Sequence, residues 1–232
     1  MKYTFLFAVL LALSFQTQAK VDHGVWDALL QKYVTSTGKV NYAGIKGEEA
    51  KLDAYLEALK TNAPSSSWSR NEKLAYWINA YNAFTVKLIV DNYPVKSITD
   101  LHGGKPWDVK WIEIGAKTYS LNNIEHDIIR PQFKEPRIHF AVNCAAKSCP
   151  PLLNKAWTAS NLGTYLNQQT RRFINNSVSN KITADVVQLS KIFEWYAKDF
   201  GNLIAYLNKY SKTEIDADAK VSYLDYNWQL NK

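Results

Sequence analysis

Residues 71–93 read NEKLAYWINAYNAFTVKLIVDNY, and this stretch decides the fold. Its large apolar side chains recur every three to four residues, and Pro94, directly after it, stops a helix. Small and apolar residues also cover most of the remaining surface, which is typical of a helix buried on all sides. We therefore predict a central helix around which the rest of the chain packs.

Two amides interrupt this apolar helix. Asn79 and Asn82 are three residues apart and share one face. A buried amide without a hydrogen-bond partner costs roughly 1–3 kcal/mol, so both side chains must find partners. Two interpretations are open. The amides bond neighbouring loops, as most buried polar groups do, or they line a polar pocket and bind a ligand.

The rest of the chain mixes helical and extended patterns. Apolar spacing of three and four residues predicts helices, and alternation predicts strands. In the first half of the chain we expect two helices within 22–62 separated by a short extended piece, two short strands within 111–119, and a helix over 121–130 that Pro131 ends. In the second half we expect a strand over 137–143, a helix over 162–174, a strand or hairpin over 181–188, helices over 189–200 and 203–210, and a packed extended tail over 221–228. This order predicts an α+β fold with many helices around a small, mostly antiparallel sheet, and a papain- or transglutaminase-like arrangement is one version of it.

The composition indicates one globular domain with a processed N-terminus. The length of 232 residues, with 47% hydrophobic and 21% charged residues, excludes a disordered or low-complexity chain. Lys2, an apolar run over residues 3–15 and a small residue at Ala19 predict a secretory signal peptide over residues 1–19. The run is shorter than a membrane span of about 20 residues, and an uncleaved anchor is the alternative. We predict a single domain over residues 20–232 that is periplasmic or secreted.

Charge and motifs narrow the classes of partner. The formal net charge of +7 becomes +6 without Lys2, the one charged residue of the predicted signal peptide. The basic residues are dispersed, which together with export argues against nucleic-acid binding. No later stretch is long and apolar enough to span a membrane. We expect a small-molecule or peptide ligand in the cell envelope, and no motif indicates a cofactor.

The two cysteines, Cys144 and Cys149, lie five residues apart in the segment NCAAKSCPP. Three interpretations are open. A close pair in an exported protein often forms a disulfide. Alternatively, Cys144 is a nucleophile at the end of a strand that presents His139, and turn dipoles and Lys147 lower the pKa of its thiol. In the third interpretation a cysteine thiolate and His126 or His139 bind a metal ion. The spacing of the two cysteines, with four residues between them, is unusual for a zinc site, so we predict no metal ligand.

A thiol nucleophile requires a base nearby. His126 and His139 are the candidate general bases, and Glu125 is the candidate to orient them. Because catalytic triads are defined by geometry, their order along the chain does not matter. The alternative for His126 is a surface or packing role, which is common for a histidine on a helix.

Further polar residues are candidates for ligand binding. Arg130 and Arg137 suit a carboxylate or phosphate, unless each forms a salt bridge with an acidic residue such as Asp199. Asn143 precedes the cysteine and is a candidate to cap its turn or to bind a ligand. Trp195 and Asp199, four residues apart, are expected to pack rather than to face a cleft.

Several of these motifs together resemble a known family, the one catalogued as domain of unknown function 547. The motifs are WINAYNA at 77–83, IEH at 124–126 with Ser120 and Arg130, RIHFA at 137–141 with NC at 143–144, IFEWY at 192–196 with DF at 199–200, and YNW at 226–228, where the family more often has Asp before Trp. The resemblance covers roughly residues 22–230 and implies exported bacterial members, but no established reaction. Its signature stretches include Asn79, Asn82, Glu125, His126, Arg130, Arg137 and His139.

Two functional hypotheses follow. The first is a thiol-dependent hydrolase or acyltransferase that acts on envelope peptides or amides, in which Cys144 attacks, His126 or His139 takes the proton and backbone N–H groups of the cysteine loop stabilise the oxyanion. The second is a non-catalytic binding module for a small anionic or peptide ligand, with Cys144 and Cys149 joined in a structural disulfide. Both require side chains distant in sequence to meet in one pocket.

Overall fold

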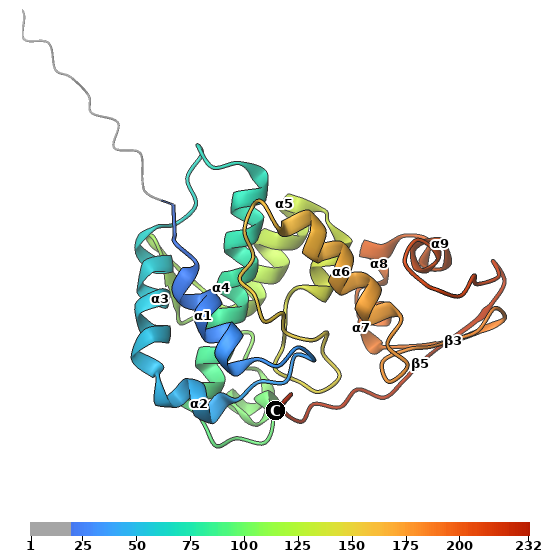
Figure 1. Cartoon of the computed structure of the whole chain (residues 1–232), viewed down its shortest axis with the longest axis horizontal. Coiled ribbons are helices and arrows are strands. Elements are labelled where there is room, and N and C mark those ends of the chain that lie inside the picture. The colour runs from blue at the N-terminus through green and yellow to red at the C-terminus, as the bar shows by residue number, and fades with distance from the viewer. Residues whose placement is uncertain (1–19) are drawn as a thin grey trace, which may run out of the picture.

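The computed structural model describes residues 20–232 (Figure 1). The predicted signal peptide lies outside the described residues. The central helix is confirmed as α4, Arg70–Asp91, and most of its residues are buried. Ser69 and Glu72 bond each other's backbone N–H in a reciprocal capping box that begins the helix. Asn92 follows the last turn, two residues before Pro94.

The N-terminal helices pack beside α4 (Figure 1). They are α1, Gly24–Tyr33, α2, Tyr42–Gly47, and α3, Glu49–Thr61. The two expected helices are confirmed, but α2 forms in part of the stretch expected to be extended. Asn41 begins α2 because its side chain accepts the Gly44 N–H, at 2.9 Å. The extended piece is reduced to one bridge between Val34 and Val40.

The middle of the chain carries the hairpin and the segments that form the site. Two short 3₁₀ turns, η1 and η2, precede the expected strands. The elements are η1, Ile98–Asp100, η2, His102–Gly104, β1, Ile112–Ile114, β2, Lys117–Tyr119, η3, Asn123–Ile129, α5, Arg130–Phe133, and η4, Pro136–Phe140. β1 and β2 pair antiparallel, as predicted.

Two predictions for this region are wrong. The helix after Ser120 does not end at Pro131, because η3 is a π-helical turn in which the Arg130 N–H bonds the Glu125 carbonyl, and the helix continues through α5. The predicted strand over 137–143 begins instead as the 3₁₀ turn η4. Its alternation does not separate a buried from an exposed face, because Ile138, His139 and Phe140 are all buried.

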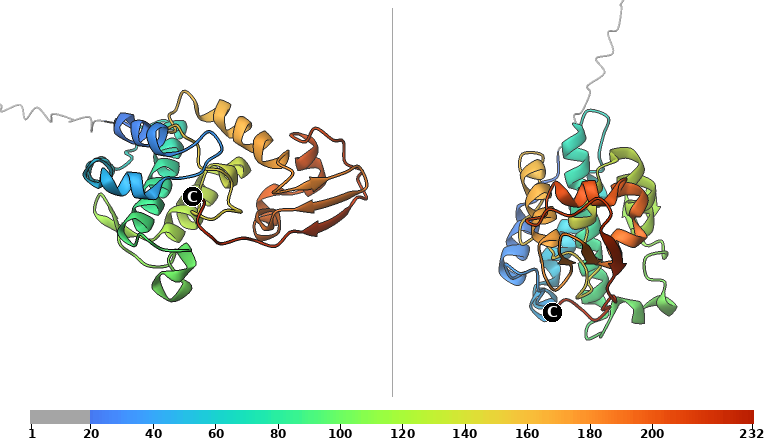
Figure 2. Two further views of the ribbon diagram at one scale, coloured as in Figure 1. Left: turned by 60° about the horizontal axis from the view of Figure 1, so that its bottom comes forward. Right: turned by 90° about the vertical axis from the view of Figure 1, so that its right-hand side faces the viewer.

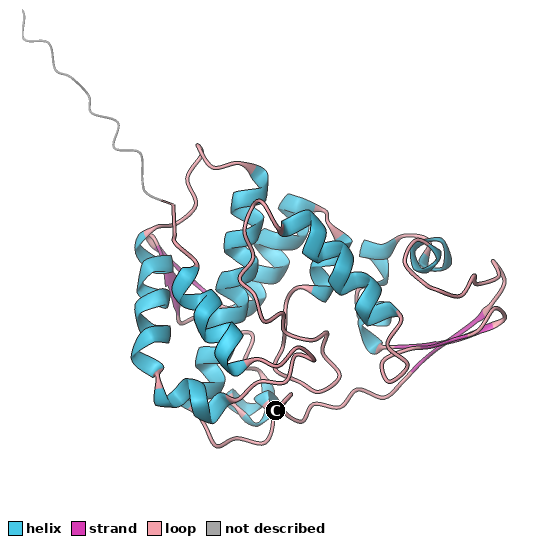
Figure 3. Ribbon diagram, viewed as in Figure 1, coloured by secondary structure: helices cyan, strands magenta, loops and turns pink. Residues whose placement is uncertain are grey.

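The C-terminal part contains the second sheet (Figure 3). Its elements are α6, Leu162–Ile174, β3, Lys181–Ile182, β4, Val186–Leu189, α7, Lys191–Trp195, α8, Ala197–Phe200, α9, Leu203–Asn208, and β5, Lys220–Tyr223. β3 pairs antiparallel with β4, and β4 pairs parallel with β5. α6 has the predicted bounds, whereas the helix expected over 189–200 is divided at Tyr196. The α+β prediction is confirmed.

Two hydrophobic clusters form the core, and the C-terminal tail connects them. The larger cluster surrounds α4. The smaller contains Phe140, Phe173 and Phe193 with side chains of the second sheet and the last helices. After β5 the tail returns to the body of the molecule (Figures 1 and 2), where Gln229 pairs with Ser97 and Leu230 with Ala146. The tail is therefore held by segments far from it in sequence.

No helix within residues 20–232 has the length and apolar character needed to cross a membrane.

His23, next to α1, makes folding stability depend on pH. Its Nδ1 lies 2.8 Å from the Tyr55 hydroxyl, and burial lowers the pKa of His23 from 6.5 to about 4. As the pH falls from 7 to 4, the unfolded chain therefore binds a proton that the folded chain excludes, and the free energy of unfolding falls by about 3 kcal/mol. We expect His23→Gln to remove this part of the decrease in urea titrations across that range. Parallel pH profiles for the two proteins would contradict the prediction.

Candidate functional site

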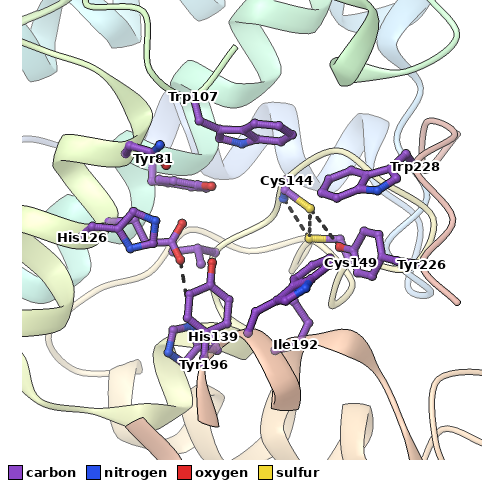
Figure 4. A pocket seen from close by; sticks show the side chains of 14 residues that line it. Tyr81, Trp107, His126, His139, Cys144, Cys149, Ile192, Tyr196, Tyr226 and Trp228 are labelled. Atoms are coloured by element: carbon purple, nitrogen blue, oxygen red, sulfur yellow. Dashed lines mark hydrogen bonds and ion pairs between the residues drawn. The ribbon is translucent and has the colours of Figure 1, made fainter. Parts of the chain in front are cut away.

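A pocket of about 210 Å³ lies between the two hydrophobic clusters. Four predicted catalytic residues line it: Glu125, His126, His139 and Cys144. Figure 4 shows the two cysteines with Tyr226 and Trp228 on one side and the two histidines on the other. The remaining lining residues are mostly aromatic and apolar: Tyr81, Trp107, Asn122, Val142, Ile192, Trp195 and Tyr196. Segments more than 100 residues apart in sequence thus meet at one small cavity.

The π-helical segment η3 carries Glu125 and His126. Ser120 and Asn123 begin this helix, because each side chain accepts the other's backbone N–H, at 3.1 and 3.0 Å. Glu125 is only 4% exposed although it lines the pocket. A carboxylate buried to this degree is expensive unless it is paired or used, and π turns are frequent at functional sites.

His139 is held by a carboxylate that the sequence interpretation assigned to packing. Its Nε2 lies 2.8 Å from Asp199 Oδ2, and a carboxylate only accepts, so Nε2 carries the proton. In the neutral ring, Nδ1 is then a free lone pair. This nitrogen is buried without a hydrogen-bond partner, and Glu125 Oε1 lies 4.0 Å away. Tyr196 stacks on the imidazole with 3.9 Å between ring centroids and fixes its plane.

Arg130 joins the two histidines. It donates to both oxygens of Asp199, at 2.7 and 2.9 Å, and its Nη1 lies 2.9 Å from His126 Nδ1. Since a guanidinium only donates, His126 Nδ1 accepts, and the neutral ring carries its proton on Nε2. Bonds from His139 and Arg130 hold the pKa of Asp199 well below its ordinary value. These bonds leave His126 Nε2 and His139 Nδ1 as the ring nitrogens that are not used by Arg130 or Asp199.

The two thiols contact each other. Cys144 is partly exposed and Cys149 is buried; both are free, and their sulfurs lie 2.7 Å apart. The Cys144 N–H donates to Cys149 Sγ at 2.9 Å, and the Tyr226 hydroxyl lies 3.1 Å from Cys144 Sγ. Burial opposes ionisation of Cys144, but hydrogen bonds from Cys149, Tyr226 and the Ala146 N–H outweigh it and lower the pKa of this thiol. Burial and the neighbouring Cys144 raise the pKa of Cys149 well above its ordinary value.

The backbone of the cysteine loop leaves no N–H for an oxyanion. Cys144 and Ala146 donate to the sulfurs, and Ala145 donates to Asn143 Oδ1. The Lys147 and Ser148 N–H groups donate to carbonyls of the tail, at 2.7 and 3.2 Å, and the Cys149 N–H to Ala146 O at 3.1 Å. The expectation that loop amides stabilise an oxyanion is therefore wrong, because the tail and the sulfurs use them.

The three candidate asparagines lie outside the pocket lining. Asn79 bonds the main chain of Trp157 through both its Nδ2 and Oδ1, at 2.7 and 3.0 Å. Asn82 donates to Ala141 O at 2.9 Å and accepts the Asn143 N–H at 2.8 Å. Asn143 donates to a carbonyl within the cysteine segment at 2.8 Å. The structure does not bring these amides to a ligand, because main-chain groups occupy them, and it shows the loop-bonding arrangement that the sequence left open.

The two candidate arginines are also paired. Arg130 is bound by Asp199, one of the ion pairs that the sequence interpretation named. Arg137 bonds Glu135 and the Asn167 side chain. Neither guanidinium lines the pocket, so neither is available there for an anionic ligand.

Sequence reasoning missed three residues of the site. Asp199 was expected to pack or to pair with Arg130, and its place in the DF motif at 199–200 was a signal for a role in the site. Tyr196 and Tyr226 contact His139 and Cys144, and their places in the IFEWY and YNW motifs were the available signals. For a metal ion, residues 20–232 offer no group of three or more His, Cys, Asp or Glu side chains.

Comparison with known proteins finds one matching family model and no individual relative. Neither the curated proteins nor the solved structures contain a match to this chain. One family model matches residues 65–174, which include α4, the π-helical segment and both cysteines. This segment is thus similar to the family described as "Protein of unknown function, DUF547", in agreement with the motifs at 77–83, 124–126, 137–141 and 143–144; the motifs at 192–200 and 226–228 lie outside the matched residues.

Proposed function

We propose that the pocket is the active site of a thiol-dependent hydrolase or acyltransferase, with Cys144 as the nucleophile. One observation carries the proposal: Cys144 lines the same small pocket as Glu125, His126 and His139. A nucleophile, a carboxylate and two oriented imidazoles in one cavity are the groups that acyl transfer requires.

Cys144 is activated without an imidazole partner. Within residues 20–232, its sulfur is bonded by Cys149, Tyr226 and the Ala146 N–H, and not by a histidine. These donors favour the thiolate, the form that attacks a carbonyl carbon. Tyr226 remains a donor, because burial and Cys144 raise the pKa of its hydroxyl well above the ordinary value. The Tyr226 hydroxyl and His126 Nε2–H are our candidates to stabilise the oxyanion in place of the loop amides.

His139 accepts the proton of deacylation in this scheme. In acylation the Cys144 thiol loses its proton to solvent, the new carbon–sulfur bond replaces the bond to the leaving group, and the leaving group takes up a proton from solvent. In deacylation water gives a proton to His139 Nδ1 and attacks the acyl carbon, and the thiolate leaves. Asp199, bonded at 2.8 Å, keeps the second nitrogen protonated and stabilises the imidazolium.

The cavity and the predicted export define the substrate class. A volume of about 210 Å³ admits a small acyl group rather than a large ligand. Trp195 and Trp228, whose ring centroids are 5.8 Å apart, offer an apolar surface beside Tyr226 for the flanking part of the substrate. With the predicted signal peptide, this favours small amides or esters of peptides in the cell envelope, for a periplasmic or secreted protein.

A small activated ester tests the proposal. Reduced protein mixed with p-nitrophenyl acetate should release a burst of nitrophenolate, and mass spectrometry should find one acetyl group on the peptide that contains Cys144. Cys144→Ala should show neither signal. Lys110→Ala changes an exposed residue outside the pocket lining, and this control variant should behave like the unaltered protein. An unacetylated Cys144 in the folded, reduced protein would contradict the mechanism.

A second candidate is a non-catalytic pocket for a small anionic or peptide ligand. The 2.7 Å distance between the sulfurs favours it, because a small approach would join them in a structural disulfide. In that case iodoacetamide labels neither cysteine in unreduced protein, and Cys144→Ser retains the ligand. The pairing of Arg130 and Arg137 favours a peptide over an anion within this candidate.

A further inference from the structure

We propose that Cys144 and Cys149 form a reversible dithiol–disulfide pair that exchanges with low-molecular-weight or peptide disulfides in the pocket, with Cys144 attacking and Cys149 resolving. This reaction uses the same nucleophile as the proposed acyl transfer, but it does not rest on that function. The exchange requires the Cys149 thiol, which has no role in the proposed acyl transfer.

The first support is the placement of the sulfurs. They lie 2.7 Å apart, and the bond of a disulfide is about 2.05 Å long, so closing it requires only a small shift. The loop between them is held in this geometry from outside. Lys147 and Ser148 bond the tail, the Asn231 N–H donates to Ala145 O at 3.1 Å, and Ala145 takes a left-handed conformation with φ 62°. Because these bonds already fix the loop, its shape does not depend on a disulfide.

The second support is the asymmetry of the two thiols. Both cysteines line the pocket, but Cys144 is partly exposed whereas Cys149 is only 7% exposed. The pKa of Cys144 is lowered and the pKa of Cys149 is raised, so Cys144 is the thiol of the pair that ionises first. Exchange requires this division: an accessible thiolate attacks first, and a protonated partner waits until the mixed disulfide has formed.

The exchange of the Cys144 and Cys149 thiols with a disulfide RSSR requires no other reactant. The Cys144 thiolate attacks one sulfur of a disulfide RSSR, the S–S bond breaks, and RS⁻ leaves and takes a proton from solvent. Cys149 then loses its proton and attacks Cys144 Sγ, and the second RS⁻ leaves with that proton. The protein is oxidised by two electrons, and the incoming disulfide is reduced to two thiols. The reverse sequence transfers the disulfide from the protein to a dithiol.

The pocket wall favours such a substrate. Tyr226 and Trp228 lie 4.5 Å apart between ring centroids, and the Tyr226 hydroxyl also contacts Cys144. Sulfur atoms pack favourably against aromatic rings, which places a substrate disulfide beside the nucleophile. A buried structural disulfide would have no such access.

The neutral aromatic disulfide 4,4′-dithiodipyridine is the probe. Reduced wild-type protein should release two equivalents of thiopyridone, and its mass should show two hydrogens lost and no attached thiopyridyl group. Cys149→Ser should release one equivalent and keep one thiopyridyl group on Cys144. Cys144→Ser should react at least about 100-fold more slowly, because its remaining thiol is buried and protonated. A wild-type protein that carries one or two stable thiopyridyl groups would overturn the proposal.

Equilibration with mixtures of reduced and oxidised glutathione separates exchange from a structural disulfide. We expect the fraction of oxidised protein, read by alkylation and mass, to change across the mixtures, and a protein oxidised in all of them would overturn the proposal. The outcome is independent of acyl transfer. Two-equivalent exchange without acetylation would contradict only the proposed function, and acetylation without exchange would contradict only this inference.

Discussion

Asp199→Asn should leave the acetylation burst of Cys144 nearly unchanged and lower steady-state turnover of p-nitrophenyl acetate by about 10²–10⁴-fold. The burst persists because the donors around Cys144 do not involve Asp199. Turnover falls because Asp199 Oδ2 accepts from both His139 and Arg130 while Oδ1 accepts a further bond from Arg130. An amide offers one acceptor where the network needs two, so it misplaces either the arginine or the imidazole proton.

The pH dependence of turnover distinguishes a positioning role of Asp199 from a general loss of structure. With Asn at 199, a proton on His139 Nδ1 would remove the lone pair that deacylation requires, and we expect the pH dependence of turnover to change as well as its size. Asp127→Asn is the matched control, because it alters an exposed carboxylate on η3, the segment that carries Glu125 and His126; Asp127 Oδ2 lies 2.6 Å from Asn123 Nδ2. An equal loss of burst and turnover, or an unaltered profile, would contradict the role given to Asp199.

Asn82→Ala should lower the free energy of unfolding by about 2–5 kcal/mol in urea titrations. The side chain is 2% exposed, and it bonds the buried Ala141 carbonyl and Asn143 N–H. Truncation leaves both main-chain groups without a partner in the core, where each unsatisfied group costs roughly 1–3 kcal/mol. The loss should exceed that of most point substitutions.

Asn92→Ala is the matched control for this effect. Asn92 follows the same helix, is exposed, and bonds only the Leu88 carbonyl, at 2.8 Å. We expect its replacement to cost less than about 1 kcal/mol, because water replaces the lost bond. Similar losses for the two variants would show that Asn82 does not hold the segment before the cysteines.

Much of the fold was predictable because several elements have strong local patterns. The α4 helix combines an apolar stripe with a capping box, and α6 has a clear amphipathic pattern, so both follow from the sequence. The turn η4 was not predictable from the alternation of polar and apolar residues. Ile138, His139 and Phe140 are all buried, so the alternation does not mark a buried and an exposed face. The π-helical turn depends on one backbone bond, from Arg130 to Glu125, which no side-chain spacing reveals.

The site was predictable only in part. Cys144, His126, His139 and Glu125 were singled out by residue type, and the structure places all four at one pocket, although their roles stay predictions. Asp199 and Tyr226 come from elements 60 and 82 residues away from the groups they contact. Local reasoning finds reactive residue types, whereas the partners that orient them depend on tertiary packing.

The returning tail determines when the pocket can exist. Tyr226 and Trp228 line it, and Gln229 and Asn231 bond the cysteine loop, yet ribosomes make these residues after every other part of the wall. A partly synthesised chain therefore carries both thiols without the tail residues that cover them and without the Tyr226 hydroxyl. The set of contacts around Cys144 is therefore complete only after the tail has been made and has returned to the body of the molecule.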